Sequence, residues 1–284
     1  MICRGLPRIT VAFLALVAGL CLPLLGTGCR SAGHGLVVAG STSVQPVMEK
    51  IGAAFQKKHP NLKVTIEGGG SSAGVMAART GTAQLGMSSR KLKPEETADG
   101  VLTAIPIAID AIAVIVHPTN PVSELTLAQL RGLFAGRLPS WKDVGGPDRQ
   151  VHLLVREEGS GTRNAFEELA MREGKEELPF DPYALIQDST GGIREVVKSD
   201  PDAIGFISLG AVATGVKVLR IEGERAEAES VRTRRYKLMR PFFLLANGRP
   251  EGPAADLLAF AIGSEAAPLL AEEGLVSVGG ASHD

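Results

Sequence analysis

From Leu36 onward the sequence repeats one local order: a short apolar segment, a turn rich in glycine and serine, and a segment with helical spacing. The first unit has the strand-like LVVA at 36–39 and the turn GSTS at 40–43. Its helical positions are Val44, Val47, Ile51 and Phe55. Strands that alternate with helices in this way predict a largely parallel sheet covered on both faces, which is an α/β architecture.

Two longer apolar segments do not fit this repeat. The segment 104–118 is long for one strand and carries Pro106 and Asp110 inside it, and 236–247 is again strand-like. We interpret them as the two crossings of a two-lobed protein. The predicted first lobe combines 34–112 with 241–284, and the second lobe spans 113–240.

The N-terminal region reads as a targeting signal. Arg4 and Arg8 precede an uncharged run of 17 residues, Ile9 to Leu25, and small residues then lead to Cys29. We predict a signal peptide over 1–28 and a lipid on Cys29, because small residues directly before a cysteine resemble a bacterial lipobox. A lipid-anchored protein of the cell envelope, periplasmic or extracytoplasmic, follows from this interpretation.

Composition excludes several classes of protein. The net charge is −1 and only 4% of residues are aromatic, so the sequence predicts no nucleic-acid partner. All three cysteines lie in the first 29 residues, and the five histidines are scattered without a metal-binding spacing. No metal site and no cofactor are predicted.

Three turns have nearly the same composition: Gly40–Ser43, Gly70–Ser72 and Gly159–Thr162. Each follows a predicted strand and opens a predicted helix, where unpaired N–H groups carry a partial positive charge. Arg156 precedes the third turn and supplies the planar set of donors that suits an oxyanion. Together these features indicate an anion site rather than three unrelated helix caps.

An enzyme is the alternative from another class. Residues 70–74 fit the G-x-S-x-G pattern of a nucleophile elbow with Ser72 as nucleophile, and His117 and His152 follow it in the chain. No HGGG-type oxyanion motif precedes this segment, and no P-loop or complete dinucleotide fingerprint is present. We therefore predict a protein that is not an enzyme, with a secreted serine hydrolase as the alternative.

Five segments in order resemble the PstS family, the substrate-binding proteins of bacterial phosphate ABC transporters. They are AGSTSVQPVMEKIGAAFQKKHP, EGGGSSAGVMAARTGTAQLGMSSRKLKPEE, IPIAIDAIAVIVHP, VREEGSGTRNAFEEL and DPDAIGFISLG. The resemblance implies the two-lobed periplasmic-binding-protein fold of type II, with two mixed or parallel sheets flanked by helices. It implies inorganic phosphate held in the cleft between the lobes.

Site residues follow from the resemblance position by position. It implies phosphate ligands in all three turns, with Arg156 as the charge partner. The implied ligands are Thr42, Ser43, Ser71, Ser89, Arg156, Ser160, Gly161 and Thr162. Secondary candidates are Ser72, Arg90, Glu158 and Arg163, with Glu158 expected to orient Arg156 and Arg90 to add a second positive charge.

One position departs from the family pattern. Members of the family often have an aspartate after the third strand that accepts the proton of HPO4 2−, and Ser89 stands at that place here. A carboxylate rejects sulfate because sulfate has no proton to donate, whereas a serine causes no such repulsion. Sulfate, molybdate or tungstate therefore remain alternative ligands.

The expected function is capture of inorganic phosphate and its delivery to the permease subunits of an ABC transporter. The protein is expected to be a monomer that touches the membrane through its lipid alone. A binding module for signalling or adhesion is a further alternative, because no partner surface is readable from the sequence.

Overall fold

The computed structural model describes residues 35–278. The predicted signal peptide and Cys29 lie outside the described residues. Within 35–278, no helix combines the length and the apolar character that crossing a bilayer requires.

Helices and strands alternate along most of the described chain. The helices are α1 (Gln45–Lys58), α2 (Ser71–Thr80), α3 (Pro94–Thr97), α4 (Leu127–Phe134), α5 (Gly161–Ala170), α6 (Thr190–Ser199), α7 (Ala228–Arg232), α8 (Gly252–Ile262) and α9 (Ala267–Glu272). The main strands are β1 (Gly35–Gly40), β2 (Lys63–Glu67), β3 (Leu85–Ser88), β4 (Leu102–Val116), β6 (His152–Arg156), β9 (Leu185–Gln187), β10 (Ala203–Ser208) and β13 (Met239–Asn247). Shorter strands are β5 (Glu124–Leu125), β7 (Arg172–Glu173), β8 (Glu176–Glu177), β11 (Lys217–Val218), β12 (Arg220–Ile221) and β14 (Val276–Ser277).

The main strands form one continuous sheet path in the order β2-β1-β3-β13-β4-β10-β6-β9. Strand β1 is parallel to β2 and β3, and β6 is parallel to β9 and β10. The predicted α/β class is thus confirmed. The two expected sheets are joined, because β4 pairs with β13 along its first part and with β10 along its last.

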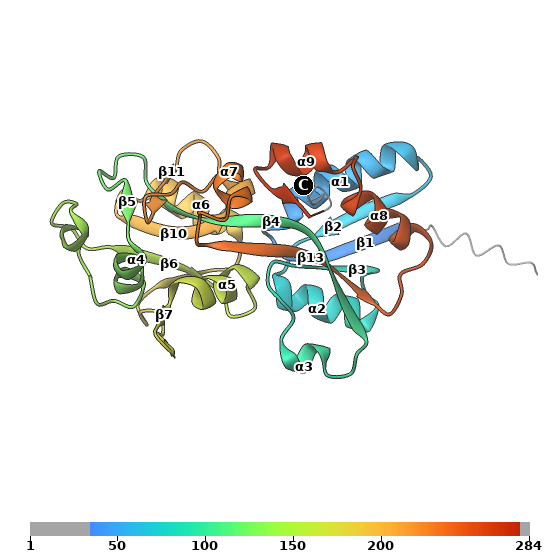
Figure 1. Ribbon diagram of the computed structural model, residues 1–284, viewed down its shortest axis with the longest axis horizontal. Coiled ribbons are helices and arrows are strands. Elements are labelled where there is room, and N and C mark those ends of the chain that lie inside the picture. Colours follow the sequence, from blue (N-terminus) through green and yellow to red (C-terminus); the bar gives the residue numbers. More distant parts are fainter. Residues whose placement is uncertain (1–34, 279–284) are drawn as a thin grey trace, which may run out of the picture. The chain divides into compact units, whose positions relative to one another are not determined.

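Both predicted crossings are single long strands that lie side by side (Figure 1). The register between β4 and β13 shifts at Phe242 and Phe243, opposite Ala108 and Pro106. Proline has no N–H to give to a ladder, so the irregularity at Pro106 lets a proline sit inside a paired strand. The segment 104–118 therefore remains a strand despite its proline.

A buried ion pair joins the two crossing strands. Asp110 and Arg240 are cross-strand partners, 0% and 2% exposed, with Arg240 Nε donating to Asp110 Oδ2 at 2.9 Å. Ser208 Oγ and the Leu209 N–H donate to the other carboxylate oxygen. Burial raises the pKa of Asp110, and the attraction of Arg240 opposes that rise.

Buried apolar side chains gather in separate clusters. The largest contains residues between Ala111 and Leu238, and a second contains residues from 36–108 and 242–275. The boundary between these two clusters falls within β4 and just before the middle of β13. Each of the two long strands therefore packs against both clusters. This separation supports the two predicted lobes, whose boundaries remain a prediction.

Glycines bring helix α2 directly onto the sheet. A Cβ at Gly40 would lie 2.3 Å from Met87 O and 2.7 Å from Gly74 Cα, and one at Gly74 would lie 2.4 Å from Met87 O. Only glycine permits this approach. The consequence for the site is that the first two predicted turns and the end of β3 lie against one another.

Candidate functional site

Turns at strand ends bring a set of hydroxyl groups together. Three are the turns that the sequence predicted, at the starts of α1, α2 and α5. A further segment, Ser189–Gly192, follows β9 and forms the N-cap and first residues of α6. We call the assembled side chains the hydroxyl cluster, and its members are Ser41, Thr42, Ser43, Ser71, Ser89, Thr162 and Thr190.

Ser43 lies at the centre of one half of the hydroxyl cluster. Its Oγ is 2.8 Å from Thr162 Oγ1 and 3.0 Å from Thr190 Oγ1. Thr42 Oγ1 is 3.2 Å from Thr190 Oγ1 and accepts a hydrogen bond from the Thr190 N–H at 3.3 Å. The structure therefore brings the predicted residues Thr42, Ser43 and Thr162 together, although 119 positions separate Ser43 from Thr162.

Ser89 lies at the centre of the other half. Its Oγ accepts a hydrogen bond from Ser41 Oγ at 2.9 Å and lies 3.4 Å from Ser71 Oγ. Its N–H donates to Ser71 Oγ at 3.0 Å. Both Ser71 and Ser89 are fully buried, so the two predicted residues form one polar contact away from solvent.

The first residues of α5, a helix that packs in the largest apolar cluster, complete the hydroxyl cluster. Ser160 caps the helix, since its Oγ accepts from the N–H groups of Thr162 and Arg163, and its own hydroxyl proton remains available to another acceptor. Gly161 packs so tightly that a Cβ there would lie 2.2 Å from Ser71 Oγ and 2.6 Å from Ser89 Oγ. The predicted residues Ser160 and Gly161 thus lie at the cluster.

Arg156 supplies a positive charge to the cluster. The residue is 1% exposed, and its Nη1 donates to Thr190 Oγ1 at 3.2 Å. Backbone carbonyls of Gln187 and Asp188 accept from Nε and Nη2. These bonds fix the guanidinium plane, so that one edge faces the hydroxyls.

Glu157, rather than the predicted Glu158, orients Arg156. Its two carboxylate oxygens accept from Arg156 Nε and Nη2, each at 2.8 Å. Glu158 is exposed. The prediction for Glu158 was wrong because neighbouring residues after a strand point to different sides, and it is Glu157 that turns towards the guanidinium.

Arg163 does not join the cluster. Its Nε donates to Glu167 at 2.8 Å and its Nη1 to the carbonyl of Arg156 at 2.9 Å. The guanidinium lies over the Phe180 ring, 4.9 Å from the ring centre. These contacts hold the Arg163 side chain along α5, where it supports the backbone of Arg156.

Arg90 and Ser72 form a separate group. Arg90 donates to both oxygens of Glu96 at 2.7 Å and to Ser72 Oγ at 3.2 Å. The Arg90 guanidinium thus donates to Glu96 and Ser72 and, unlike that of Arg156, makes no bond to a member of the hydroxyl cluster. Ser72 and Arg90 are both turned towards this ion pair, so neither belongs to the hydroxyl cluster.

The Arg90–Glu96 pair predicts a loss of stability in acid. Burial would raise the pKa of Glu96, but hydrogen bonds from Arg90 and the Lys93 N–H hold that pKa below the ordinary value of a glutamate. A carboxylate with a lowered pKa in the folded state stabilises the fold above its unfolded pKa and loses that contribution as pH falls through the folded value. The free energy of unfolding should therefore fall below about pH 4.5 in the wild type, and less so in Glu96→Gln.

Denaturant unfolding at neutral and acidic pH measures this difference. The matched control is Glu95→Gln, which changes the exposed neighbouring carboxylate and should keep the wild-type dependence on pH. If the free energy of unfolding of Glu96→Gln fell in acid as much as that of the wild type, the Arg90–Glu96 pair would not be the source of the loss.

The residues proposed for a serine hydrolase lie with other partners. Ser72 accepts from Arg90, His117 Nδ1 lies 2.8 Å from Thr119 Oγ1, and His152 Nδ1 lies 2.7 Å from an oxygen of Asp200. No serine–histidine hydrogen bond forms among these three residues. In the part of the chain that the structure describes, no group of three or more His, Cys, Asp or Glu is placed to hold a metal ion.

Thr190 and Ser41 are the cluster members that the sequence analysis missed. Thr190 is 2% exposed and contacts Thr42, Ser43 and Arg156. The signal was present in Ser189-Thr190-Gly191-Gly192, which has the composition of the other turns. It was overlooked because β9, the strand before it, is three residues long and has no fully buried residue.

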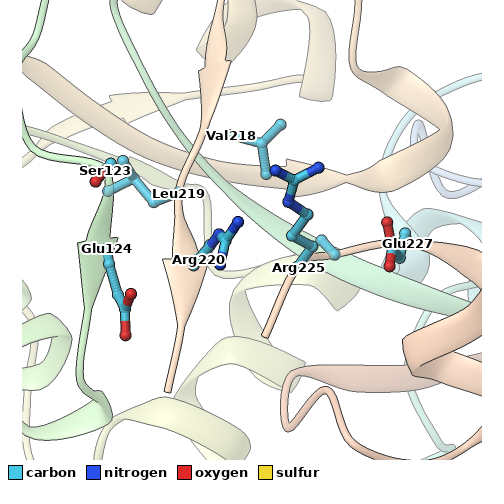
Figure 2. Close-up of a pocket in the computed structure, with 8 residues that line it drawn as sticks. Ser123, Glu124, Val218, Leu219, Arg220, Arg225 and Glu227 are labelled. Carbon is cyan, nitrogen blue, oxygen red and sulfur yellow. The ribbon is translucent and has the colours of Figure 1, made fainter. Parts of the chain in front are cut away.

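Figure 2 shows a surface cavity of about 610 Å³, and no member of the hydroxyl cluster lines it. It is lined by Ser123, Glu124, Val218, Leu219, Arg220, Arg225, Ala226 and Glu227. Glu124 and Arg220 are partners on the paired strands β5 and β12. Charges of both signs line this cavity and none of the predicted site residues does, so it is not the predicted anion site.

Comparison with known proteins gives one family and several relatives. The PBP superfamily domain matches residues 27–265. The structure of an ABC transporter substrate-binding protein from Clostridium perfringens with bound phosphate is 36% identical, with a TM-score of 0.81, covering 86% of this chain and 99% of that one. An ABC-type phosphate transport receptor from Vibrio cholerae is 32% identical, with a TM-score of 0.69 and the same coverage. The phosphate-binding protein PstS of Bacillus subtilis is 27% identical over 233 residues, which is 81% of this chain and 76% of the relative.

Proposed function

This chain belongs to the PBP superfamily and is PstS-like, and from that premise we propose that it binds inorganic phosphate and delivers it to an ABC transporter. The hydroxyl cluster around Arg156 is the observation that carries the proposal. It gathers O–H and N–H donors next to one buried guanidinium, from turns that open helices of different hydrophobic cores, α1 in one and α5 in the other.

The chemistry of these groups suits a dehydrated tetrahedral oxyanion. Hydroxyls rotate to donate or accept, helix N-termini favour negative charge, and a guanidinium presents parallel donors. Phosphate held in this way exchanges its hydration shell for directed hydrogen bonds. The proposed ligands are Thr42, Ser43, Ser71, Ser89, Arg156, Ser160, Gly161, Thr162 and Thr190.

Closure of two lobes around the anion is part of this proposal. The boundaries 34–112 with 241–284, and 113–240, are supported by the separate apolar cores and by the two long strands between them. The permease would recognise the closed form, and the ligand would leave unchanged, without a chemical reaction.

Attachment to the cell envelope is supported by the sequence alone. The signal-like residues 1–28 and the cysteine at position 29 support a lipid-anchored protein outside the cytoplasm. A monomer bound to its membrane through that lipid fits delivery to a permease.

Thr190 should contribute measurably to phosphate affinity. Replacing it with valine removes the hydroxyl that contacts Arg156, Thr42 and Ser43. Each of these side chains then loses one hydrogen-bond partner. The expected loss is about 1–3 kcal/mol, or roughly 5- to 150-fold in Kd. The matched variant Thr190→Ser keeps the hydroxyl and should bind nearly as the wild type does. Calorimetry that gives equal affinities for the valine and serine variants would remove Thr190 from the site.

Ser89 should control the choice between phosphate and sulfate. In Ser89→Asp the new carboxylate lies among buried hydroxyls, where hydrogen phosphate can donate a proton to it and sulfate cannot. The preference for phosphate should rise by on the order of tenfold or more, since a buried group left unpaired discriminates strongly. Ser89→Asn, similar in size and uncharged, should not raise it. A ratio of affinities that does not change in the aspartate variant would show that Ser89 does not face the ligand.

The proposed function is tested by calorimetric titration of a protein that spans residues 30–284. Bound ligand is first removed by unfolding and refolding, and phosphate, sulfate and molybdate are then titrated separately. We expect tight one-to-one binding of phosphate and weaker binding of the others. Preference for another oxyanion would keep the site and change the substrate, whereas no binding of any of them would overturn the proposal.

A further inference from the structure

A buried arginine outside the proposed ligand set reaches the hydroxyl cluster through a backbone carbonyl. Arg240 is 2% exposed, and its Nη1 donates to the carbonyl of Ser89 at 3.5 Å. Burial lowers the pKa of Arg240, Asp110 opposes that change, and the positive charge of Arg156 adds to it. The guanidiniums of Arg240 and Arg156 are thus close enough to influence each other.

Asp110 fixes one edge of the Arg240 guanidinium. Arg240 Nε donates to Asp110 Oδ2 at 2.9 Å, and Ser208 Oγ and the Leu209 N–H donate to Asp110 Oδ1. The guanidinium also lies over the Phe242 ring, 5.3 Å from the ring centre. Because the charge of Arg240 is balanced by that of Asp110, the pair adds no net charge to the site. The contribution that remains to Arg240 is geometric.

Buried side chains from other segments hold both backbone polar groups of Ser89. Its N–H donates to Ser71 Oγ at 3.0 Å, and its carbonyl accepts from Arg240. These bonds fix the peptide groups on either side of the Ser89 Cα, and with them the direction of the side chain. A polar contact is stronger in a buried region than in water, so the long contact to Arg240 still orients the carbonyl. Ser89 Oγ is thereby held 2.9 Å from Ser41 Oγ and 3.4 Å from Ser71 Oγ.

This chain of contacts crosses four neighbouring strands. Ser89 directly follows β3, Arg240 lies on β13, Asp110 is its partner on β4, and Ser208 ends β10. The strands β3, β13, β4 and β10 are adjacent in that order in the sheet. The position of the Arg240 side chain is therefore set by the register of the two crossing strands rather than by the turn after β3.

We infer that Arg240 is a positioning residue for anion binding, which holds the Ser89 carbonyl so that the Ser89 hydroxyl faces the bound phosphate. Asp110 in turn holds Arg240, and Arg240 itself contacts no phosphate oxygen. The inference rests on the proposed phosphate site and adds to it a residue from outside the turns that form the hydroxyl cluster.

The test is Arg240→Lys in the protein of residues 30–284. Lysine keeps a positive charge opposite Asp110, but its single ammonium group does not hold a carboxylate and a carbonyl in the fork geometry of a guanidinium. We expect a folded protein whose affinity for phosphate, measured by calorimetry, is about tenfold lower than that of the wild type. In the Ser89→Ala background the same substitution should change the affinity by less than about twofold, because the hydroxyl that Arg240 positions is absent.

A second variant removes the ion pair without leaving a costly unpaired charge in the interior. Asp110→Asn combined with Arg240→Met deletes both charges and the donor to Ser89, while asparagine still offers an oxygen to Ser208 and Leu209. This variant should show the same loss of phosphate affinity, again only when the Ser89 hydroxyl is present. Denaturant unfolding establishes that each variant is folded under the conditions of the titration.

Arg79→Lys is the matched control. Arg79 also donates to a carboxylate and to a backbone carbonyl, those of Asp99 and Glu96, which lie outside the hydroxyl cluster. This variant should bind phosphate as the wild type does. Wild-type affinity in both Arg240 variants, or the same fold-loss with and without the Ser89 hydroxyl, would overturn the positioning role. Neither result would affect the proposed phosphate site, which the titration of the wild type tests separately.

Discussion

Arg156→Ala should lower the affinity for phosphate by roughly 30-fold to several thousand-fold. Arg156 is buried and donates to Thr190 in the hydroxyl cluster, so its removal leaves a dehydrated anion without its charge partner. Truncating one side of a buried charged pair costs about 2–5 kcal/mol. Calorimetric titration of the variant with phosphate measures the loss.

The matched control for this variant is Arg137→Ala. Arg137 is more than half exposed and pairs with Glu173 away from the hydroxyl cluster. Arg137→Ala removes the same type of side chain from the same predicted lobe as Arg156→Ala does, and it should leave the affinity for phosphate unchanged. Equal affinity of Arg156→Ala and wild type would remove the guanidinium from the site.

Gly161→Ala should weaken phosphate binding by about 5- to 150-fold. The added methyl group would lie 2.2 Å from Ser71 Oγ and 3.0 Å from Ser71 Cβ, so α5 and α2 must move apart or the serines must turn away. Overpacking of this kind costs about 1–3 kcal/mol. It destabilises the arrangement in which α2 and α5 hold the proposed phosphate-binding residues together.

Gly159→Ala is a closely matched control for Gly161→Ala. A Cβ at Gly159, two positions earlier in the same turn, would lie 3.7 Å from Ser72 Cβ, which is an ordinary contact. This variant should bind phosphate as the wild type does. If both alanine variants bound equally well, the tight packing at Gly161 would have no part in the function.

Local composition was sufficient to predict most of the fold and much of the cluster. The turns at 40–43, 70–72 and 159–162 could be recognised because each combines glycine with hydroxyl residues between a strand pattern and a helix pattern. The crossing strands were recognisable because a long apolar run needs burial along its whole length. Individual ligands such as Ser43 and Thr162 lie in those turns, but they were named through the resemblance to the PstS family.

Contacts between distant segments could not be predicted in the same way. Ser89 is followed by Arg90, which looks like a free cation in the sequence, but the turn of α3 brings Glu96 onto it. Likewise, nothing in Glu157-Glu158 shows which carboxylate faces Arg156, because that depends on the backbone direction after β6. The position of Thr190 depends on the packing of β9 beside β6, a pairing that joins segments more than 30 residues apart.

A crystal structure of the protein grown with phosphate tests the central claim most directly. The account predicts one phosphate in hydrogen-bond contact with Arg156 and with hydroxyls or amides from several of the turns that form the cluster. A phosphate bound only elsewhere, for example at Arg220 and Arg225 in the cavity of Figure 2, would contradict it.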